Sequence, residues 1–231
     1  MSDGSGAGAR QRAARRDGRL SVLARVQLGI EALYRVETRL DVEAFVIDER
    51  ERAATGVARA PREQLLVRQS SDEELDLALF IDERALCNLE RHDPAGGLHA
   101  ANFDDFCLIV EGVSHFIYVA LCAAVERRVT ALELELQAEV DKFACCSLLQ
   151  RDGAPDDLRQ RLFRDVRFAH DLDATERDRY LTANGEADRY AESLERRFVE
   201  PDRVDEMLAD LRRFYRLSLA DKLGHIARAA G

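Results

Sequence analysis

Positive charge is scarce in this 231-residue sequence. Lys and Arg together number 34 against 44 Asp and Glu residues, which gives a formal net charge of -10 at pH 7. A general nucleic-acid-binding protein needs clustered positive charge to neutralise phosphates. The charge balance therefore argues against nucleic acid as a partner and favours a soluble protein. Lysine itself occurs only at Lys142 and Lys222, and this preference for arginine indicates a GC-rich genome and a bacterial-type protein.

The motifs of several common enzyme classes are also missing. The sequence contains no GxxxxGK[ST] phosphate loop, no GxGxxG dinucleotide fingerprint, no HExxH zinc motif and no GxSxG nucleophile elbow. Each of these motifs places a particular chemical group at a particular turn or helix. Their absence removes the strong functional signals and leaves less specific patterns to be weighed.

Signals for secretion and membrane insertion are absent too. The five cysteines include no CxxC pair, and four of them lie in apolar helical sequence, where a thiol behaves as a small hydrophobic group. Residues 1–19 have no apolar stretch, so we expect a disordered, Arg-bearing tail. The apolar stretch from Phe106 to Val125 contains Glu111 and His115, which are costly in a bilayer. These features predict a cytoplasmic protein with reduced thiols and no membrane span.

Residues 20–93 predict a small α+β subdomain. Apolar residues at helical spacing predict a helix over residues 20–36. Three segments with strand character follow at residues 41–48, 63–69 and 75–82, separated by polar or proline-containing stretches. We expect these strands to form a three-stranded antiparallel meander with the first helix on its apolar face.

Residues 103–231 predict a helical bundle of about five helices, so that the whole chain belongs to a predominantly helical α+β class. The first two helices, at about residues 103–127 and 130–150, are joined by a tight turn near Arg128. Apolar spacing predicts further helices over residues 155–170 and 175–199, from Pro201 onward and from Ser218 onward.

The first bundle helix carries charges within an apolar run. Glu111 and His115 lie one turn apart in the segment "EGVSHFIYVALCAAV". In a tight antiparallel hairpin, positions equidistant from the turn lie at the same level, which makes Asp141 and Lys142 their expected partners. Because an unpaired buried charge is very costly, we expect a buried polar layer that also includes Ser114.

Three roles fit this layer. A hydrogen-bonded network fixes the register of the two helices without any chemistry. A divalent metal site would use Glu111, His115 and Glu139 as oxygen and nitrogen ligands. An acid/base catalytic site would use Glu111, His115, Asp141 and Lys142, provided that they face a pocket.

The segment "RDVRFAH" places Arg164 and His170 with five residues between them. This spacing resembles the Arg-x4–6-His signature of HEPN ribonuclease domains, which are helical bundles, usually dimeric, that pair Arg and His to cleave RNA. The resemblance implies catalytic roles for Arg164 and His170 and cleavage without a metal ion.

We therefore expect a soluble cytoplasmic protein that acts without catalysis and without a cofactor, through contacts with a protein partner or with a second copy of itself. The first alternative is a metal-assisted or acid/base enzyme that uses the polar layer. The second alternative is a HEPN-like ribonuclease.

Overall fold

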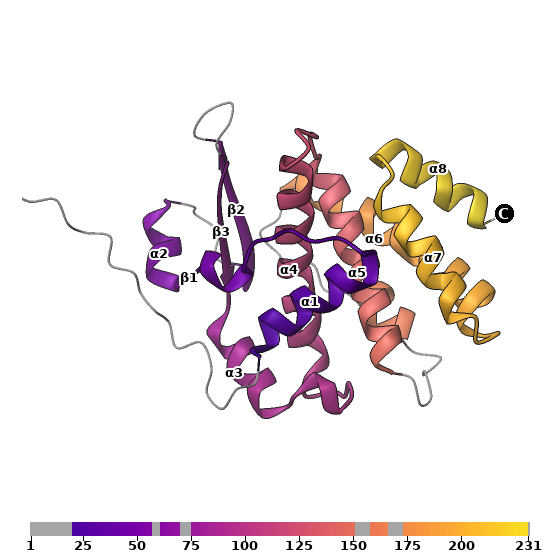
Figure 1. Cartoon of the computed structure of the whole chain (residues 1–231), viewed down its shortest axis with the longest axis horizontal. Helices are drawn as coiled ribbons and strands as arrows, with labels where there is room; N and C mark the ends of the chain where they lie inside the picture. Colours follow the sequence, from indigo (N-terminus) through magenta and orange to yellow (C-terminus); the bar gives the residue numbers. More distant parts are fainter. Residues whose placement is uncertain (1–19, 57–60, 70–74, 151–157, 166–172, 231) are drawn as a thin grey trace, which may run out of the picture.

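The apolar helix that contains Glu111 and His115 lies at the centre of the molecule (Figure 1). The computed structural model describes residues 20–56, 61–69, 75–150, 158–165 and 173–230. Within these residues the protein is a mostly helical α+β structure with a small mixed three-stranded sheet. The sheet packs on one side of the central helix α4 (Phe103–Ala123), and the carboxyl-terminal helices lie toward the other side.

Helix α1 (Val22–Tyr34) crosses in front of α4 in Figure 1 and also packs against α7 (Val204–Tyr215). The Ser21 side chain caps α1 by accepting a hydrogen bond from the backbone N–H of Ala24. Arg212 of α7 satisfies a carbonyl group at the other end of α1 by donating to the Leu33 oxygen at 2.8 Å. Such donors compensate for the helical partners that the last carbonyls of a helix lack.

The sheet differs from the predicted antiparallel meander. Strands β2 (Glu63–Gln69) and β3 (Leu75–Ile81) form the expected antiparallel pair, but β1 (Val46–Ile47) runs parallel to β3, and the strand order is β1-β3-β2. The meander prediction was therefore wrong. Its first strand is shortened by a 3-10 turn over Val42–Phe45, and the short helix α2 (Glu49–Ala54) provides a crossover toward the opposite edge of β3.

The predicted helical hairpin is present. Helix α3 (Glu83–Arg91) and a 3-10 turn at Pro94–Gly96 lead into α4, which is followed by α5 (Ala131–Leu149). Thr130 caps α5 by accepting a hydrogen bond from the Glu133 N–H at 3.2 Å, as its position before an apolar run indicates.

The helices after the hairpin form the remaining part of the fold. Of the helix expected over residues 155–170, the described part contains a π-helical turn at Gln160–Arg164. Helix α6 (Ala174–Leu194) continues into a π-helical turn at Glu195–Val199, and α7 and α8 (Leu219–Ala230) follow. Helix α6 packs along α5, and α8 packs on α6.

One continuous hydrophobic core joins these elements. Its fully buried members include Ile30 of α1, Leu79 of β3, Ile117 of α4 and Phe214 of α7. Both segments that the sequence suggests as separate units, residues 20–93 and residues 103–231, therefore contribute side chains to the same core.

Helix α4 is the described helix whose length and composition would suffice to cross a membrane. In the folded protein, however, 72% of its most apolar window is buried by other parts of the chain. Core helices of soluble proteins pass the same test, so this helix is weak evidence for a membrane span.

Candidate functional site

The α4–α5 hairpin brings Glu111 and Lys142 together, as the sequence predicts. The Lys142 Nζ donates to Glu111 Oε2 at 3.0 Å and to Glu139 Oε1 at 2.8 Å. Glu139 lies one turn before Lys142 on α5, so the ammonium is held between one carboxylate of its own helix and one of α4. The Lys142 side chain is 12% exposed.

His115 lies between two other glutamates. Its Nδ1 is 3.6 Å from Glu63 Oε1 of β2, and its Nε2 is 3.8 Å from Glu135 Oε2 of α5. Both distances exceed ordinary hydrogen-bond length, and Glu63 Oε1 and His115 Nε2 are buried atoms without a hydrogen-bond partner. The predicted partner Asp141 lies elsewhere. We refer to Glu63, Glu111, Glu135 and Glu139, with His115 and Lys142, as the carboxylate cluster.

Electrostatics fix the charges of three members of the carboxylate cluster, His115, Glu111 and Lys142. Burial alone would lower the pKa of His115, but the carboxylates of Glu63, Glu135 and Glu111 raise it to about 9. Burial would raise the pKa of Glu111, yet Lys142 and His115 hold it below its usual value. The pKa of Lys142 is raised because Glu111 and Glu139 outweigh the effect of burial. These three groups are therefore ionised at neutral pH.

Glu135 has a pKa close to neutral pH. Burial raises its pKa to about 7, and the opposing effect of His115 is smaller. Its other oxygen lies 3.9 Å from Arg179 Nε of α6. Glu135 can consequently gain or lose a proton near pH 7.

A polar pocket of about 530 Å³ reaches the edge of the carboxylate cluster. Glu111 and Lys142 line it, together with residues from the start of α4 and from the π-helical turn. These other lining residues are Phe103, Asp104, Cys107, Leu108, Arg161, Leu162 and Asp165.

Asp141 belongs to a second polar group, on another side of the hairpin. Its carboxylate accepts hydrogen bonds from Tyr34 of α1, from Ser114 Oγ at 2.5 Å and from Gln137 Nε2 at 2.7 Å. Burial raises the pKa of Asp141 to about 6, although these hydrogen bonds act in the opposite direction. Asp141 therefore links α1, α4 and α5 and makes none of the contacts predicted for it with His115.

Lys222 is the member of this second group that the sequence reasoning missed. It comes from α8, is completely buried, and donates to Gln137 Oε1 and to the Tyr118 hydroxyl, both at 2.7 Å. Its ammonium lies 4.4 Å from the centre of the Tyr118 ring, and burial lowers its pKa to about 7. A signal was present, since Leu219 and Ile226 place Lys222 on an apolar helix face.

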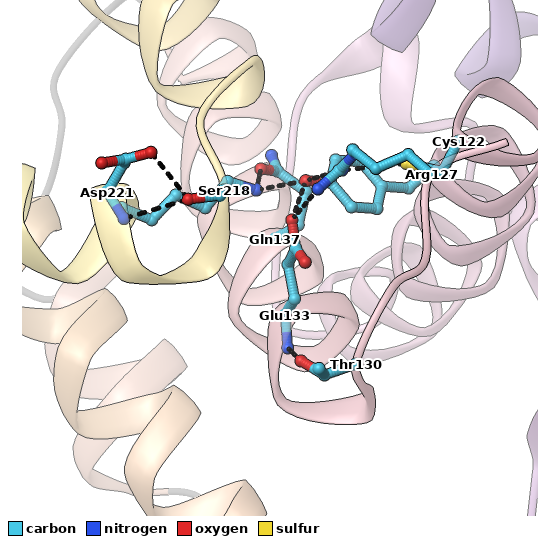
Figure 2. A network of polar contacts seen from close by, with 9 residues as sticks. Cys122, Arg127, Thr130, Glu133, Gln137, Ser218 and Asp221 are labelled. Atoms are coloured by element: carbon cyan, nitrogen blue, oxygen red, sulfur yellow. Dashed lines mark hydrogen bonds and ion pairs between the residues drawn. The ribbon is translucent and has the colours of Figure 1, made fainter. Parts of the chain in front are cut away.

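Figure 2 shows how this group continues to the turn of the hairpin. Arg127 donates to Glu133 Oε1 at 2.7 Å and to the Tyr118 hydroxyl at 2.9 Å, and the same hydroxyl donates to Glu133. The start of α8, capped by Ser218, lies beside this group (Figure 2). We refer to Asp141, Gln137, Lys222, Tyr118 and Glu133 as the interior network.

The predicted metal ligands lie in a different environment from the one expected. Glu111 and Glu139 both contact the Lys142 ammonium, whereas His115 faces Glu63 and Glu135. Among the described residues, no group of three or more His, Cys, Asp or Glu side chains has an arrangement that could hold a metal ion. A metal at Glu111, His115 and Glu139 stays a prediction from the sequence.

Arg164, the first residue of the HEPN-like pair, is exposed, and its Nε lies 3.7 Å from Asp188 Oδ2 of α6. His170 lies outside the described residues. The pairing of the two side chains therefore stays a prediction.

An apolar groove of about 230 Å³ lies between α1 and the end of α5. Val22, Val26 and Leu33 of α1 form one wall, and Leu148 and Leu149 of α5 contribute to the other. Leu149 is 39% exposed at this groove.

In comparisons with protein-family models, curated proteins and solved structures, nothing matches this chain.

Proposed function

We propose that this soluble, cytoplasmic protein acts without catalysis, by associating with a second copy of itself through the apolar groove. The groove carries this proposal because its walls are almost entirely apolar and Leu149 is exposed at it. Leu28 of α1, which is 53% exposed, lies one turn from the groove residue Arg25. Exposed apolar surface of this kind is typical of protein contact sites.

A twofold contact fits these residues. When two copies meet through α1, Leu28 of each copy lies beside the groove of the other, so that both grooves are covered by one isologous interface. The net charge of -10 on each copy opposes association, so added salt should strengthen it.

The ion pair of Glu111 and Lys142 in the polar pocket supports a role without catalysis. The pKa of Glu111 is lowered and the pKa of Lys142 is raised, so both values lie further from pH 7 than the ordinary values of these groups. A catalytic acid or base works best with a pKa near the operating pH. A stable ion pair suits recognition and helix register better than proton transfer.

Sedimentation equilibrium over a range of protein and salt concentrations tests self-association. We expect a monomer–dimer equilibrium that Leu28→Asp shifts to monomer by at least tenfold in the dissociation constant. Leu181→Asp is the matched control, because Leu181 is 49% exposed on α6, away from the groove. A wild-type chain that stays monomeric at all concentrations would contradict the proposal, as would equal effects of both variants.

Acid/base catalysis is the second candidate, supported by the near-neutral pKa of about 7 at Glu135 and by the pocket at the cluster's edge. Such a centre should exchange acidic C–H protons of small amino and carbonyl compounds with solvent. Proton NMR in deuterated water detects this exchange. Exchange that Glu135→Gln abolishes would favour the enzyme over the binding protein.

A further inference from the structure

Arg161 presents an unused cation to the polar pocket. Its guanidinium carbon lies 3.7 Å from the centre of the Phe103 ring, so the group lies against helix α4 at the wall of the pocket. The neighbouring arginines are different, because Arg159 and Arg164 both pair with Asp188. Within the described part of the chain, Arg161 has no carboxylate partner.

Asp104 presents an unused anion to the same pocket. It is an exposed residue in the first turn of α4, and it makes no ion pair or side-chain hydrogen bond with another described residue. Its neighbour Asp105 contrasts with it, since that carboxylate accepts hydrogen bonds from Arg62 and Asn88. Asp104 and Arg161 do not pair with each other, so the pocket contains two separated charges of opposite sign.

The rest of the pocket limits the charge that a ligand can carry. Lys142 uses two of its three ammonium protons on Glu111 and Glu139, which leaves one. Among the described lining residues, the carboxylates Asp104, Glu111 and Asp165 outnumber the cations Lys142 and Arg161 by one, so a simple anion meets net repulsion. A simple cation would leave Arg161, which has no carboxylate partner among the described residues, without a counter-charge.

From this arrangement we infer that the pocket binds a small zwitterion of the α-amino acid type. The ligand carboxylate binds the guanidinium of Arg161 and the remaining proton of Lys142, and its ammonium group binds Asp104. Phe103, Leu108 and Leu162 supply apolar surface for the ligand side chain. The volume of about 530 Å³ lies within the range of about 300–1,000 Å³ that is typical of small-molecule sites.

The inference is tested with the free protein amino acids, added singly at 10 mM to the full chain, roughly a hundred times a dissociation constant of ~0.1 mM. We expect at least one of them to raise the melting temperature by about 5 °C or more. A ligand at a hundred times its dissociation constant stabilises the folded state by about 2.7 kcal/mol, and 1 kcal/mol shifts the melting temperature of a chain of this size by about 2–4 °C. Calorimetric titration then gives its dissociation constant.

For that amino acid, the amide, which lacks the carboxylate, and the desamino acid, which lacks the ammonium group, should each bind at least tenfold more weakly. Arg161→Gln and Asp104→Asn should each raise the dissociation constant at least tenfold. Arg164→Gln, next to the pocket but outside its lining, should leave it unchanged. Both pocket variants alter exposed or partly exposed side chains, and their melting temperatures without ligand report whether they fold.

The inference is overturned if no amino acid shifts the melting temperature, or if Arg161→Gln binds as tightly as the wild type. Equal binding of the amino acid and its desamino acid would mean an anion site and would also overturn it. None of these results depends on self-association through the apolar groove.

Discussion

At the residue scale, His115 of the carboxylate cluster and Lys222 of the interior network make the stability of the fold depend on pH in opposite ways. His115 has its pKa raised to about 9 from an ordinary 6.5, so its stabilising contribution is complete below pH 6.5 and is lost as the pH rises through 9. Lys222 has its pKa lowered to about 7 from an ordinary 10.5, so folding becomes more favourable as the pH rises from 7 toward 10.5. Two variants separate these contributions.

His115→Gln removes the first contribution. The wild type should exceed this variant in free energy of unfolding at pH 6, and the difference should shrink by roughly 1–3 kcal/mol by pH 9, because the folded protein then loses the proton held by the carboxylates. Urea unfolding at several pH values measures the difference. His92→Gln, which changes an exposed histidine after α3, is the control. A difference that is constant with pH would mean that the pKa of His115 is the same in the folded and the unfolded protein.

Lys222→Met removes the second contribution while keeping the length of the side chain. Between pH 7 and 9.5 the wild type should gain roughly 3 kcal/mol relative to the variant, because the unfolded chain keeps the lysine proton that the interior network releases. The same urea experiment measures it. An unchanged difference across this range would show that the buried ammonium stays protonated throughout it.

At the element scale, the close packing of α4 on the sheet depends on Gly112. A Cβ atom at this position would lie 2.9 Å from Glu63 Cγ and 3.2 Å from Leu79 Cδ1. The glycine therefore allows β2 to bring Glu63 next to His115, even though glycine is a poor residue for a helix interior.

Gly112→Ala should lower the free energy of unfolding by roughly 1–3 kcal/mol, because Glu63 and Leu79 must move away from α4. Gly29→Ala is the matched control in a helix, since nothing lies within 4 Å of its added Cβ. That variant should raise the free energy of unfolding by roughly 0.5–1 kcal/mol through helix propensity. Urea unfolding of both variants provides the comparison. A stabilised Gly112→Ala protein would contradict the packing.

The sequence predicted the elements better than the contacts between them. Periodicity and caps located the α4–α5 hairpin, and the hairpin's symmetry correctly paired Glu111 with Lys142. Symmetry within one hairpin could not show that β2 would deliver Glu63 to His115, because that contact depends on the tertiary arrangement of the sheet. The parallel β1 was missed for a related reason: strand character in residues 41–48 does not specify which edge of the sheet the strand joins.

At the scale of the whole molecule, charge bears on the ribonuclease alternative. The net charge of -10 disfavours binding to a phosphate backbone, and Arg164 lies next to the carboxylate of Asp188. We expect single-stranded RNA to remain intact when incubated with the protein without metal, as followed by gel electrophoresis. Cleavage that disappears in His170→Ala, with unchanged helix content by circular dichroism, would establish the ribonuclease instead.

The shared core also determines how the whole chain should unfold. The Tyr34 hydroxyl of α1 donates to Asp141 of α5, and Arg216, which follows α7, donates to the Tyr34 carbonyl oxygen at 2.9 Å. Residues 20–93 therefore have contacts on both the middle and the end of the helical part. Since neither part keeps its buried surface when the other unfolds, we expect one cooperative transition.

Differential scanning calorimetry tests this expectation on the full chain. The calorimetric and van't Hoff enthalpies should agree, and Arg216→Ala should move the single transition to lower temperature, by roughly 2–4 °C for a loss of about 1 kcal/mol. If residues 20–93 were an independent subdomain, weakening their link to α7 would instead split the transition into two. A resolved second transition, in the wild type or in Arg216→Ala, would therefore contradict the shared core and support the division into residues 20–93 and residues 103–231 that the sequence predicts.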